Sequence, residues 1–294
     1  MLDIQPVEVD DGLEIEVKLS GTALIDADTI AFTSCLECET QEECLPREFY
    51  SDSEWEEIVN HPLYDEKTHS IYNYDEDELL LIAKGRIEEI RHLTGTKDVE
   101  LYFSSGKTFR HSLTEVYKRN RADFRYPSGL AWLKDELCRL YKGEVCDGYE
   151  ADDIVVYLKR RYPKKYVLAA IDKDVLNSVV GKHFDYYHSR MSWVEIDAET
   201  ATKWAYMQCL MGDPSDNVKG CPGIGKKRAE KILEGLYFPD EMWRAVVSTY
   251  ESKGLTEKHA IENMRLVNMH QLTEVDGKIQ VVLWQPPVGV KNAK

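Results

Sequence analysis

Three short apolar segments constrain the fold of this 294-residue chain most strongly, because each one ends directly at polar or acidic residues. They cover residues 22–25, 99–103 and 166–171. Short apolar runs of this kind are typical of strands that are buried in a parallel sheet. Segments with the apolar spacing of a helix, such as residues 76–93 and 128–141, lie between them. The pattern therefore predicts an α/β fold with a central, mainly parallel sheet.

Carboxylates gather where these segments end. The carboxyl end of a parallel strand is where α/β proteins place their ligands. Each acidic group has an ordinary alternative, since an aspartate can cap a helix and acids in a first turn complement the helix dipole. The four groups are Asp26 after the first strand, Glu150, Asp152 and Asp153 before a helix, Asp172 and Asp174 after the third strand, and Asp213 and Asp216 after another helix.

Four acidic groups in one α/β unit would repel one another, since neighbouring carboxylates raise one another's pKa. Cations remove that repulsion, and hard oxygen ligands of this type suit Mg²⁺ or Mn²⁺. The repetition of the pattern therefore predicts a metal site, although each group alone is weak support for one.

The stretch that carries Asp213 and Asp216 continues into the glycine turn Gly223-Ile224-Gly225 and then into a helix that begins with Lys226 and Lys227. A glycine turn before a helix directs backbone N–H groups at an anion, and the helix N-terminus adds partial positive charge. One segment thus combines metal ligands with a phosphate-binding turn. This pairing indicates an enzyme that holds a nucleic-acid backbone and cuts it with metal ions.

The net charge of −16 is distributed unevenly. Residues 1–100 contain 27 acidic and 7 basic residues, whereas residues 101–294 contain 26 acidic and 30 basic residues. Local charge matters more than the total for binding a polyanion. The basic segment 117–125 holds four basic and two aromatic residues, a composition suited to phosphates and splayed bases but also to an ordinary charged helix.

Other features predict an intracellular protein. The seven cysteines are scattered and odd in number, which fits a reducing cytoplasm better than a disulfide framework. No apolar run approaches ~18 residues, so we expect no membrane span. The N-terminus shows no secretory signal pattern.

Several of these motifs together resemble the 5′-nuclease (flap endonuclease) superfamily, and the tail resembles that of short-tailed bacteriophage 5′→3′ exonucleases. The most specific of the matches is the stretch from Gly212 to Ala229. The matching residues are Gly148-Tyr149-Glu150-Ala151-Asp152-Asp153, Ile171-Asp172-Lys173-Asp174, Gly212-Asp213-Pro214-Ser215-Asp216-Asn217 with Gly220, Gly223, Gly225 and Lys227, the basic motif Tyr117-Lys118-Arg119-Asn120-Arg121, and Leu283-Trp284-Gln285-Pro286 near the end.

The resemblance implies three regions. Residues 1–20 form an acidic N-terminal extension, and residues 21–198 form a PIN-like catalytic core that includes a helical arch at about 106–127. Residues 199–294 form a duplex-binding region of the helix-hairpin-helix type and a C-terminal tail. The resemblance also implies a monomer that binds double-stranded or 5′-flapped DNA.

The resemblance also implies roles for individual residues. Asp172 is shared between the two metal ions, Lys118 neutralises the scissile phosphate, and Arg121 assists. A K⁺ ion is expected in the turn from Gly220 to Gly225. The implied metal ligands are Asp26, Glu150, Asp152, Asp153 and Asp172 for the first ion and Asp174, Asp213 and Asp216 for the second. The implied DNA-binding residues are Tyr117, which would stack near an unpaired end, with Lys118, Arg119, Arg121, Arg125, Gly223, Gly225, Lys226 and Lys227.

The function implied is a metal-dependent 5′→3′ exodeoxyribonuclease or flap endonuclease of phage DNA replication that leaves 5′-phosphates. An RNA primer paired with DNA would be a further substrate. The chain departs from the family pattern where Ser105 stands in place of an aspartate, because a hydroxyl is a poorer ligand for a hard cation. Two alternatives stay open: a DNA-structure-binding protein with weakened catalysis, and a PIN-type ribonuclease acting on single-stranded RNA.

Overall fold

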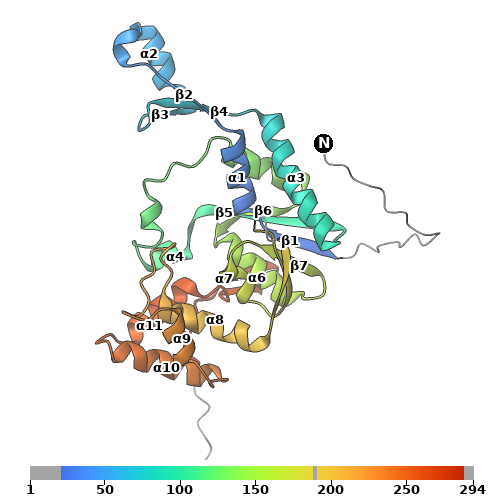
Figure 1. The fold of residues 1–294 in the computed structure, drawn as a ribbon, viewed down its shortest axis with the longest axis vertical. Coiled ribbons are helices and arrows are strands. Elements are labelled where there is room, and N and C mark those ends of the chain that lie inside the picture. Colours follow the sequence, from blue (N-terminus) through green and yellow to red (C-terminus); the bar gives the residue numbers. More distant parts are fainter. Residues whose placement is uncertain (1–20, 188–190, 288–294) are drawn as a thin grey trace, which may run out of the picture.

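The computed structural model describes residues 21–187 and 191–287, and it centres on a six-stranded sheet (Figure 1). The predicted acidic extension 1–20 lies outside the described residues. The strand order is β6-β5-β1-β7-β8-β9, and all neighbours run parallel except β8 and β9. The strands are β1 (Thr22–Asp26), β5 (Asp98–Thr108), β6 (Lys142–Gly148), β7 (Tyr166–Ala170), β8 (Gly181–Asp185) and β9 (Ser192–Ile196).

The three predicted strands correspond to β1, β5 and β7, which lie side by side at the centre of the sheet. Strand β5 runs further than predicted, to Thr108, with a shift of register against β6 between Ser104 and Thr108. Strand β6 was not predicted, because its sequence Lys-Gly-Glu-Val-Cys-Asp-Gly contains no apolar run. Edge strands such as this one are less buried and lack the signal of a central strand.

Both faces of the sheet are covered, because side chains of β1 alternate between two cores. Ala23 and Ile25 belong to one core, and Leu24 belongs to the other. The first core is closed by helices α1 (Asp28–Cys38), α3 (Glu76–Thr94) and α5 (Leu130–Leu140). The second is closed by α6 (Ala151–Arg161) and α7 (Lys173–Asn177).

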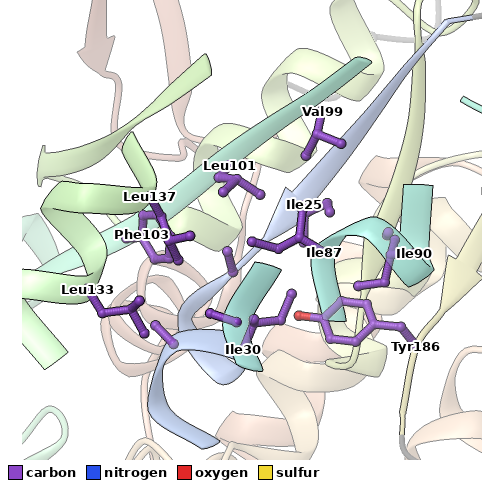
Figure 2. Close-up of a cluster of buried hydrophobic side chains, with 14 of the residues drawn as sticks. Ile25, Ile30, Ile87, Ile90, Val99, Leu101, Phe103, Leu133, Leu137 and Tyr186 are labelled. Atoms are coloured by element: carbon purple, nitrogen blue, oxygen red, sulfur yellow. The ribbon is translucent and has the colours of Figure 1, made fainter. Parts of the chain in front are cut away.

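Figure 2 shows the first core. Ile25 and Leu101 from the sheet face Ile87 of α3, while Phe103 packs near Leu137 of α5. These side chains are fully buried. Burial of a side chain of this size contributes about 1.5–3 kcal/mol, so this core holds the central strands, and with them the carboxyl edge of the sheet, in place.

An insert between α1 and α3 forms a small antiparallel sheet that extends away from the main body (Figure 1). Its strand order is β2-β4-β3. Helix α2 lies within the insert, and Ser51 and Glu54 form a capping box at its N-terminus. The insert comprises β2 (Thr40–Glu43), the 3₁₀ turn η1 (Arg47–Phe49), α2 (Asp52–Val59), β3 (Tyr64–Asp65) and β4 (Ser70–Asn73).

The C-terminal helices pack around a separate core that contains Trp243, Tyr250 and Met264. A hairpin then follows, and its turn at Asp276 and Gly277 has positive φ at both residues, which is typical of a tight hairpin turn. These elements are α8 (Ala198–Met211), α9 (Lys226–Ile232), α10 (Pro239–Glu251), α11 (Glu257–Val267), β10 (Leu272–Val275) and β11 (Lys278–Val281).

The arch segment, residues 106–127, contains only one short helix, α4 (Phe109–Leu113), and one 3₁₀ turn, η2 (Arg119–Arg121). The rest of the segment has little regular structure. The following helix α5 begins at Leu130, with Gly129 as its N-cap. Across the described parts of the chain, no helix is both long and apolar enough to cross a membrane.

Candidate active site

The carboxyl edge of the central sheet brings together acids from separate segments. Asp26 is the last residue of β1, Asp152 lies in the first turn of α6, and Asp172 follows β7 as the N-cap of α7. The side chains of Asp26 and Asp152 are hydrogen-bonded to each other. Burial and the charge of Asp28 raise the pKa of Asp26 to about 7, and burial and Asp26 raise that of Asp152 well above its usual value. The two shifts have one cause, because two buried carboxyls this close disfavour being charged together.

Asp174 and Asp213 extend this cluster. Burial and the charges of Asp172 and Asp213 raise the pKa of Asp174 to about 7. Burial also raises the pKa of Asp172, with Asp213 and Asp216 adding to the effect. The structure thus places all four predicted acidic groups close enough to interact. Within residues 21–187 and 191–287, however, no three metal-binding side chains already form a closed ligand set.

A tight loop holds Asp213 and Asp216. Asp213 and Val218 form a backbone bridge, with Asp213 N donating to Val218 O at 2.8 Å and Val218 N donating to Asp213 O at 2.7 Å. Gly212 and Gly220 meet behind it, and a Cβ on Gly212 would lie only 2.3 Å from Val218 O and 2.5 Å from Gly220 N. Only glycine permits this backbone approach, so the two glycines in the Gly212–Ala229 motif set where the carboxylates stand.

The arch segment packs onto these acids. The Tyr117 hydroxyl lies 2.7 Å from Asp216 Oδ2 and 3.1 Å from Glu150 Oε2. Lys118 Nζ lies 2.7 Å from Glu150 Oε1, and Arg121 is 2.6 Å from Asp216 Oδ1. Although burial raises the pKa of Glu150, positive charge nearby, including that of Lys118, outweighs it and holds this pKa below its usual value. Cationic side chains of the arch segment thus form ion pairs with two of the predicted metal ligands.

Tyr117 is 3% exposed, so the structure does not support the prediction that it stacks on a base. Its ring is buried, and its hydroxyl serves the carboxylates. The aromatic side chains that do face solvent in this segment are Phe124, 54% exposed, and Tyr126, 59% exposed. Their ring centroids are 5.7 Å apart.

Asp153 is also placed differently from the prediction. It is fully buried, and its carboxylate accepts hydrogen bonds from both terminal nitrogens of Arg110, at 2.6 and 2.7 Å. The backbone N–H of Glu150 donates a third, at 3.1 Å. Because these donors occupy both oxygens, the geometry does not fit Asp153 as a metal ligand. Arg110 was not among the predicted residues, since nothing in the sequence links it to an acid 43 positions away.

The other predicted DNA-binding residues of the arch differ in their accessibility. Arg119 is exposed. Arg125 pairs with Glu39 at the start of the insert and stacks over the Tyr72 ring at 3.6 Å. Arg125 therefore anchors the far end of the arch segment to the insert, and in this arrangement it does not point freely into solvent.

Ser105, which stands where the family has an aspartate, is exposed on β5. Its neighbour Ser104 contacts the active-site helix instead, because its Oγ accepts a hydrogen bond of 3.0 Å from Ala151 N. The backbone N–H of Ser104 also donates to Asp28 Oδ2 at 3.0 Å, and Lys134 Nζ pairs with the other oxygen of Asp28. Asp28 is thus neutralised by a lysine rather than directed at the acidic cluster.

The glycine turn lies beside the acidic loop. Gly223, Gly225, Lys226 and Lys227 are all exposed. Gly223 has φ +75, a conformation that favours glycine, and its carbonyl accepts a hydrogen bond of 2.6 Å from Arg228. The predicted phosphate-binding turn is therefore accessible, on the same connection between α8 and α9 that carries Asp213 and Asp216.

Similar sequences occur in two kinds of protein, while no protein-family model matches the chain. A thermostable DNA polymerase I of Thermus thermophilus is 32% identical over 164 residues, covering 51% of this chain and 19% of the polymerase. A 5′-3′ exonuclease of Buchnera aphidicola is 29% identical over 148 residues, covering 45% of this chain and 51% of that protein. The match thus spans about a fifth of the polymerase and about half of the exonuclease.

Two solved structures have the same fold. The bacteriophage T5 D15 protein co-crystallized with metal ions gives a TM-score of 0.56 at 16% identity, covering 84% of this chain and 89% of that one. The T5 D15 flap endonuclease in a pseudo-enzyme–product complex with DNA and metal ions gives 0.53 at 19% identity, covering 65% and 80%. These matches confirm the predicted fold class.

Proposed function

We propose that this chain is a metal-dependent 5′→3′ nuclease that hydrolyses phosphodiesters of duplex or 5′-flapped DNA. The observation that carries the proposal is the convergence of carboxylates from four segments at one edge of the sheet, with raised pKa values at Asp26 and Asp174. Perturbed acids of this kind gather at functional sites. The similarity to 5′-3′ exonucleases, and to a fold crystallised with metal ions and DNA, supports the same conclusion.

The donor chemistry fits two hard divalent cations, Mg²⁺ or Mn²⁺, because every candidate ligand is a carboxylate. The proposed ligands are Asp26, Glu150, Asp152 and Asp172 on one side of the cluster and Asp174, Asp213 and Asp216 on the other. When bound, such ions activate water at neutral pH and stabilise charge on the leaving oxygen. Because burial raises the pKa of both Asp26 and Asp152, protons would compete with a cation for these two carboxyls.

The arch supplies the cationic groups for the substrate. Lys118 and Arg121 now neutralise Glu150 and Asp216. Once cations take those carboxylates, the same two side chains are free to contact the scissile phosphate. Phe124 and Tyr126, which are exposed, offer faces on which a splayed base could stack.

The glycine turn is the proposed binding site for the phosphates of duplex DNA. Gly223, Gly225, Lys226 and Lys227 are exposed, and they follow the acidic loop directly in the chain. A K⁺ ion in the turn from Gly220 to Gly225 would extend this site. Holding duplex phosphates at a set distance from Asp213 and Asp216 would define where the strand is cut. We further propose that the chain acts as a monomer, in the cytoplasm and in phage DNA replication, and that RNA paired with DNA is a second substrate.

A labelled-substrate assay tests the proposal. Blunt duplex, 5′-flap DNA, an RNA–DNA hybrid and single-stranded RNA are incubated with Mg²⁺ or Mn²⁺. The proteins compared are the wild type, Asp172→Asn, and Asp135→Asn as a control at an exposed site on α5. We expect cleavage of flap or duplex DNA by the wild type and the control, and loss of cleavage in Asp172→Asn.

Three other results would each point elsewhere. Tight binding of flap DNA with no cleavage under either metal would favour a DNA-structure-binding protein. Preferential cleavage of single-stranded RNA would favour a PIN-type ribonuclease. Equal activity of Asp172→Asn and the wild type would show that the acidic cluster is not the catalytic centre.

A further inference from the structure

Arg110 connects three parts of the molecule through one buried guanidinium. It lies in α4 at the root of the arch segment and is 2% exposed. Its terminal nitrogens hold the Asp153 carboxylate of α6 in a bidentate pair. Its Nε donates to Leu266 O at 2.7 Å, and one terminal nitrogen also reaches Asn268 O at 3.2 Å. All three nitrogens of the Arg110 guanidinium therefore donate hydrogen bonds to other groups of the protein.

The partners on α6 lie directly behind the acidic cluster. Asp153 accepts the backbone N–H of Glu150, and this contact closes the capping box at the start of α6. The same Arg110 stands 3.5 Å from Glu150 Oε2. The position of Glu150 is therefore set from two directions, through its backbone by Asp153 and through its carboxylate by Arg110.

The partners on the other side belong to the C-terminal helices. Leu266 lies in the last turn of α11, and Asn268 is its C-cap. Carbonyls at a helix C-terminus have no partner within the helix and carry partial negative charge, so a cation is favourable there. Arg110 thus fastens the end of α11 to the capping residue of the active-site helix. A lysine could not do both, because only the planar fork holds a carboxylate in two places while Nε donates elsewhere.

We propose that Arg110 is a positioning residue for Glu150, and that Asp153 is its counter-ion rather than a metal ligand. The Arg110–Asp153 pair also transmits the docking of α11 to the acidic cluster. The proposal rests on the proposed function for the identity of the cluster as a metal site. Its tests measure metal binding and backbone protection, so they give a result even if the protein cuts no substrate.

Measurements of Mn²⁺ binding by variants at Arg110 and Asp153 test whether Asp153 is the counter-ion of Arg110 or a metal ligand. Asp153→Asn leaves Arg110 unpaired beside Glu150, and we expect the dissociation constant for Mn²⁺ to rise about tenfold, the scale typical of residues that support metal ligands. Adding Arg110→Met removes that unpaired charge, and affinity should recover in part, to about threefold weaker than wild type, because Arg110 no longer positions Glu150. Adding Asp152→Asn to this double variant is the matched control, and it should lose Mn²⁺ affinity because Asp152 is a proposed ligand while the Arg110 and Asp153 positions are already neutral.

The outcome that overturns the counter-ion assignment is a double variant that binds Mn²⁺ no better than Asp153→Asn alone. Because Arg110→Met by itself leaves a buried carboxylate unpaired and risks misfolding, the double variant, whose pair is neutral, is the informative protein. Its thermal transition is recorded alongside to show that it folds.

Hydrogen exchange tests the link to α11. In the wild type, Mn²⁺ should slow exchange of the amides at 264–269 at least several-fold, because the cluster and the end of the helix share Arg110. In the Arg110→Met, Asp153→Asn double variant this effect should vanish while Mn²⁺ still binds. Equal protection in both proteins would contradict the transmission role.

Discussion

The hydroxyl of Tyr117 and the Oδ2 atom of Asp216, 99 positions apart in the chain, lie 2.7 Å from each other. This contact, together with the pairing of Lys118 to Glu150, places the arch segment over the acidic cluster. Asn217 adds a hydrogen bond of 2.7 Å to Val116 O, and Lys118 N donates to Asp216 O at 2.9 Å. The arch segment and the acidic loop are therefore joined by several hydrogen bonds.

Tyr117→Phe should lower stability without metal. The change removes a buried hydroxyl that serves two carboxylates, and an unsatisfied buried partner costs about 1–3 kcal/mol. We expect the free energy of unfolding, measured by urea denaturation in EDTA, to fall by about that amount. Tyr126→Phe is the control, because Tyr126 is exposed. If both variants unfold at the same urea concentration as wild type, the contact with Asp216 contributes nothing.

Lys118→Ala should separate chemistry from metal binding. Under the proposed function, Lys118 stabilises charge on the scissile phosphate, and loss of one such group typically costs about 10²–10³ in kcat. Metal affinity should stay equal or improve, because the lysine no longer competes for Glu150. Cleavage rates test the expected loss in kcat, and Mn²⁺ titrations test the expected metal affinity. Lys84→Ala on the exposed face of α3 is the control. A variant that retains full cleavage would remove Lys118 from the catalytic assignment.

The metal-free protein should lose stability as pH rises from about 4 to about 7. Asp26 has a pKa of about 7 in the folded chain, against a usual value of 3.8, because of burial and the nearby charges of Asp28 and Asp172. Over this window the unfolded chain binds fewer protons than the folded chain, so the free energy of unfolding falls as pH rises. We expect the thermal midpoint in EDTA to be at least ~5 °C lower at pH 7.5 than at pH 5.

Two comparisons test whether Asp26 causes this decrease of the thermal midpoint with rising pH. In Asp26→Asn the thermal midpoint should depend less on pH, because the side chain at position 26 no longer has a proton to lose. Saturating Mn²⁺ should raise the midpoint more at pH 7.5 than at pH 5, because protons no longer compete for the carboxylates. A slope that is unchanged in Asp26→Asn would place the pH dependence elsewhere in the molecule.

Gly212→Ala should displace the acidic loop. Both Gly212 and Gly254 have positive φ, +74 and +75, but only at Gly212 would a Cβ meet backbone atoms at 2.3–2.5 Å. Gly254→Ala is therefore matched for a positive φ but lacks the contact with backbone atoms. We expect Gly212→Ala to lose several-fold more metal affinity than the control, measured by Mn²⁺ titration. Similar affinities in the two variants would mean that the loop tolerates a shift at Gly212.

The sequence predicts the centre of the fold better than its edges. Residues 22–25 and 166–171 are continuous apolar runs because β1 and β7 are buried on both faces, and the acids after them follow from that position. Strand β6 carries no such run, because it lies at an edge of the sheet. The arch segment was predicted as helical from its basic motif, whereas its contacts with Asp216 and Glu39 lie far away in the sequence.

The acidic site was predictable as a set but not residue by residue. The sequence identifies carboxylates that gather, because their spacing from strand and helix ends is local. It does not say which cation neutralises each one. Asp153 is paired with Arg110, and Arg110 in turn contacts Leu266, 156 positions along the chain. Only the folded chain shows that, within the run Glu150-Ala151-Asp152-Asp153, Asp153 is paired with Arg110 and Glu150 with Lys118.

The pairing of Arg125 with Glu39 limits how far the arch can travel. If Arg125 stays paired with Glu39 while the contacts at Asp216 break, the seven residues 118–124 are released. Their movement is then limited by the length of this segment. A fully extended chain of that length reaches roughly 25 Å. The opening that a strand could pass through is therefore bounded by a fixed length of polypeptide, and lengthening or shortening residues 119–124 would change its maximum width.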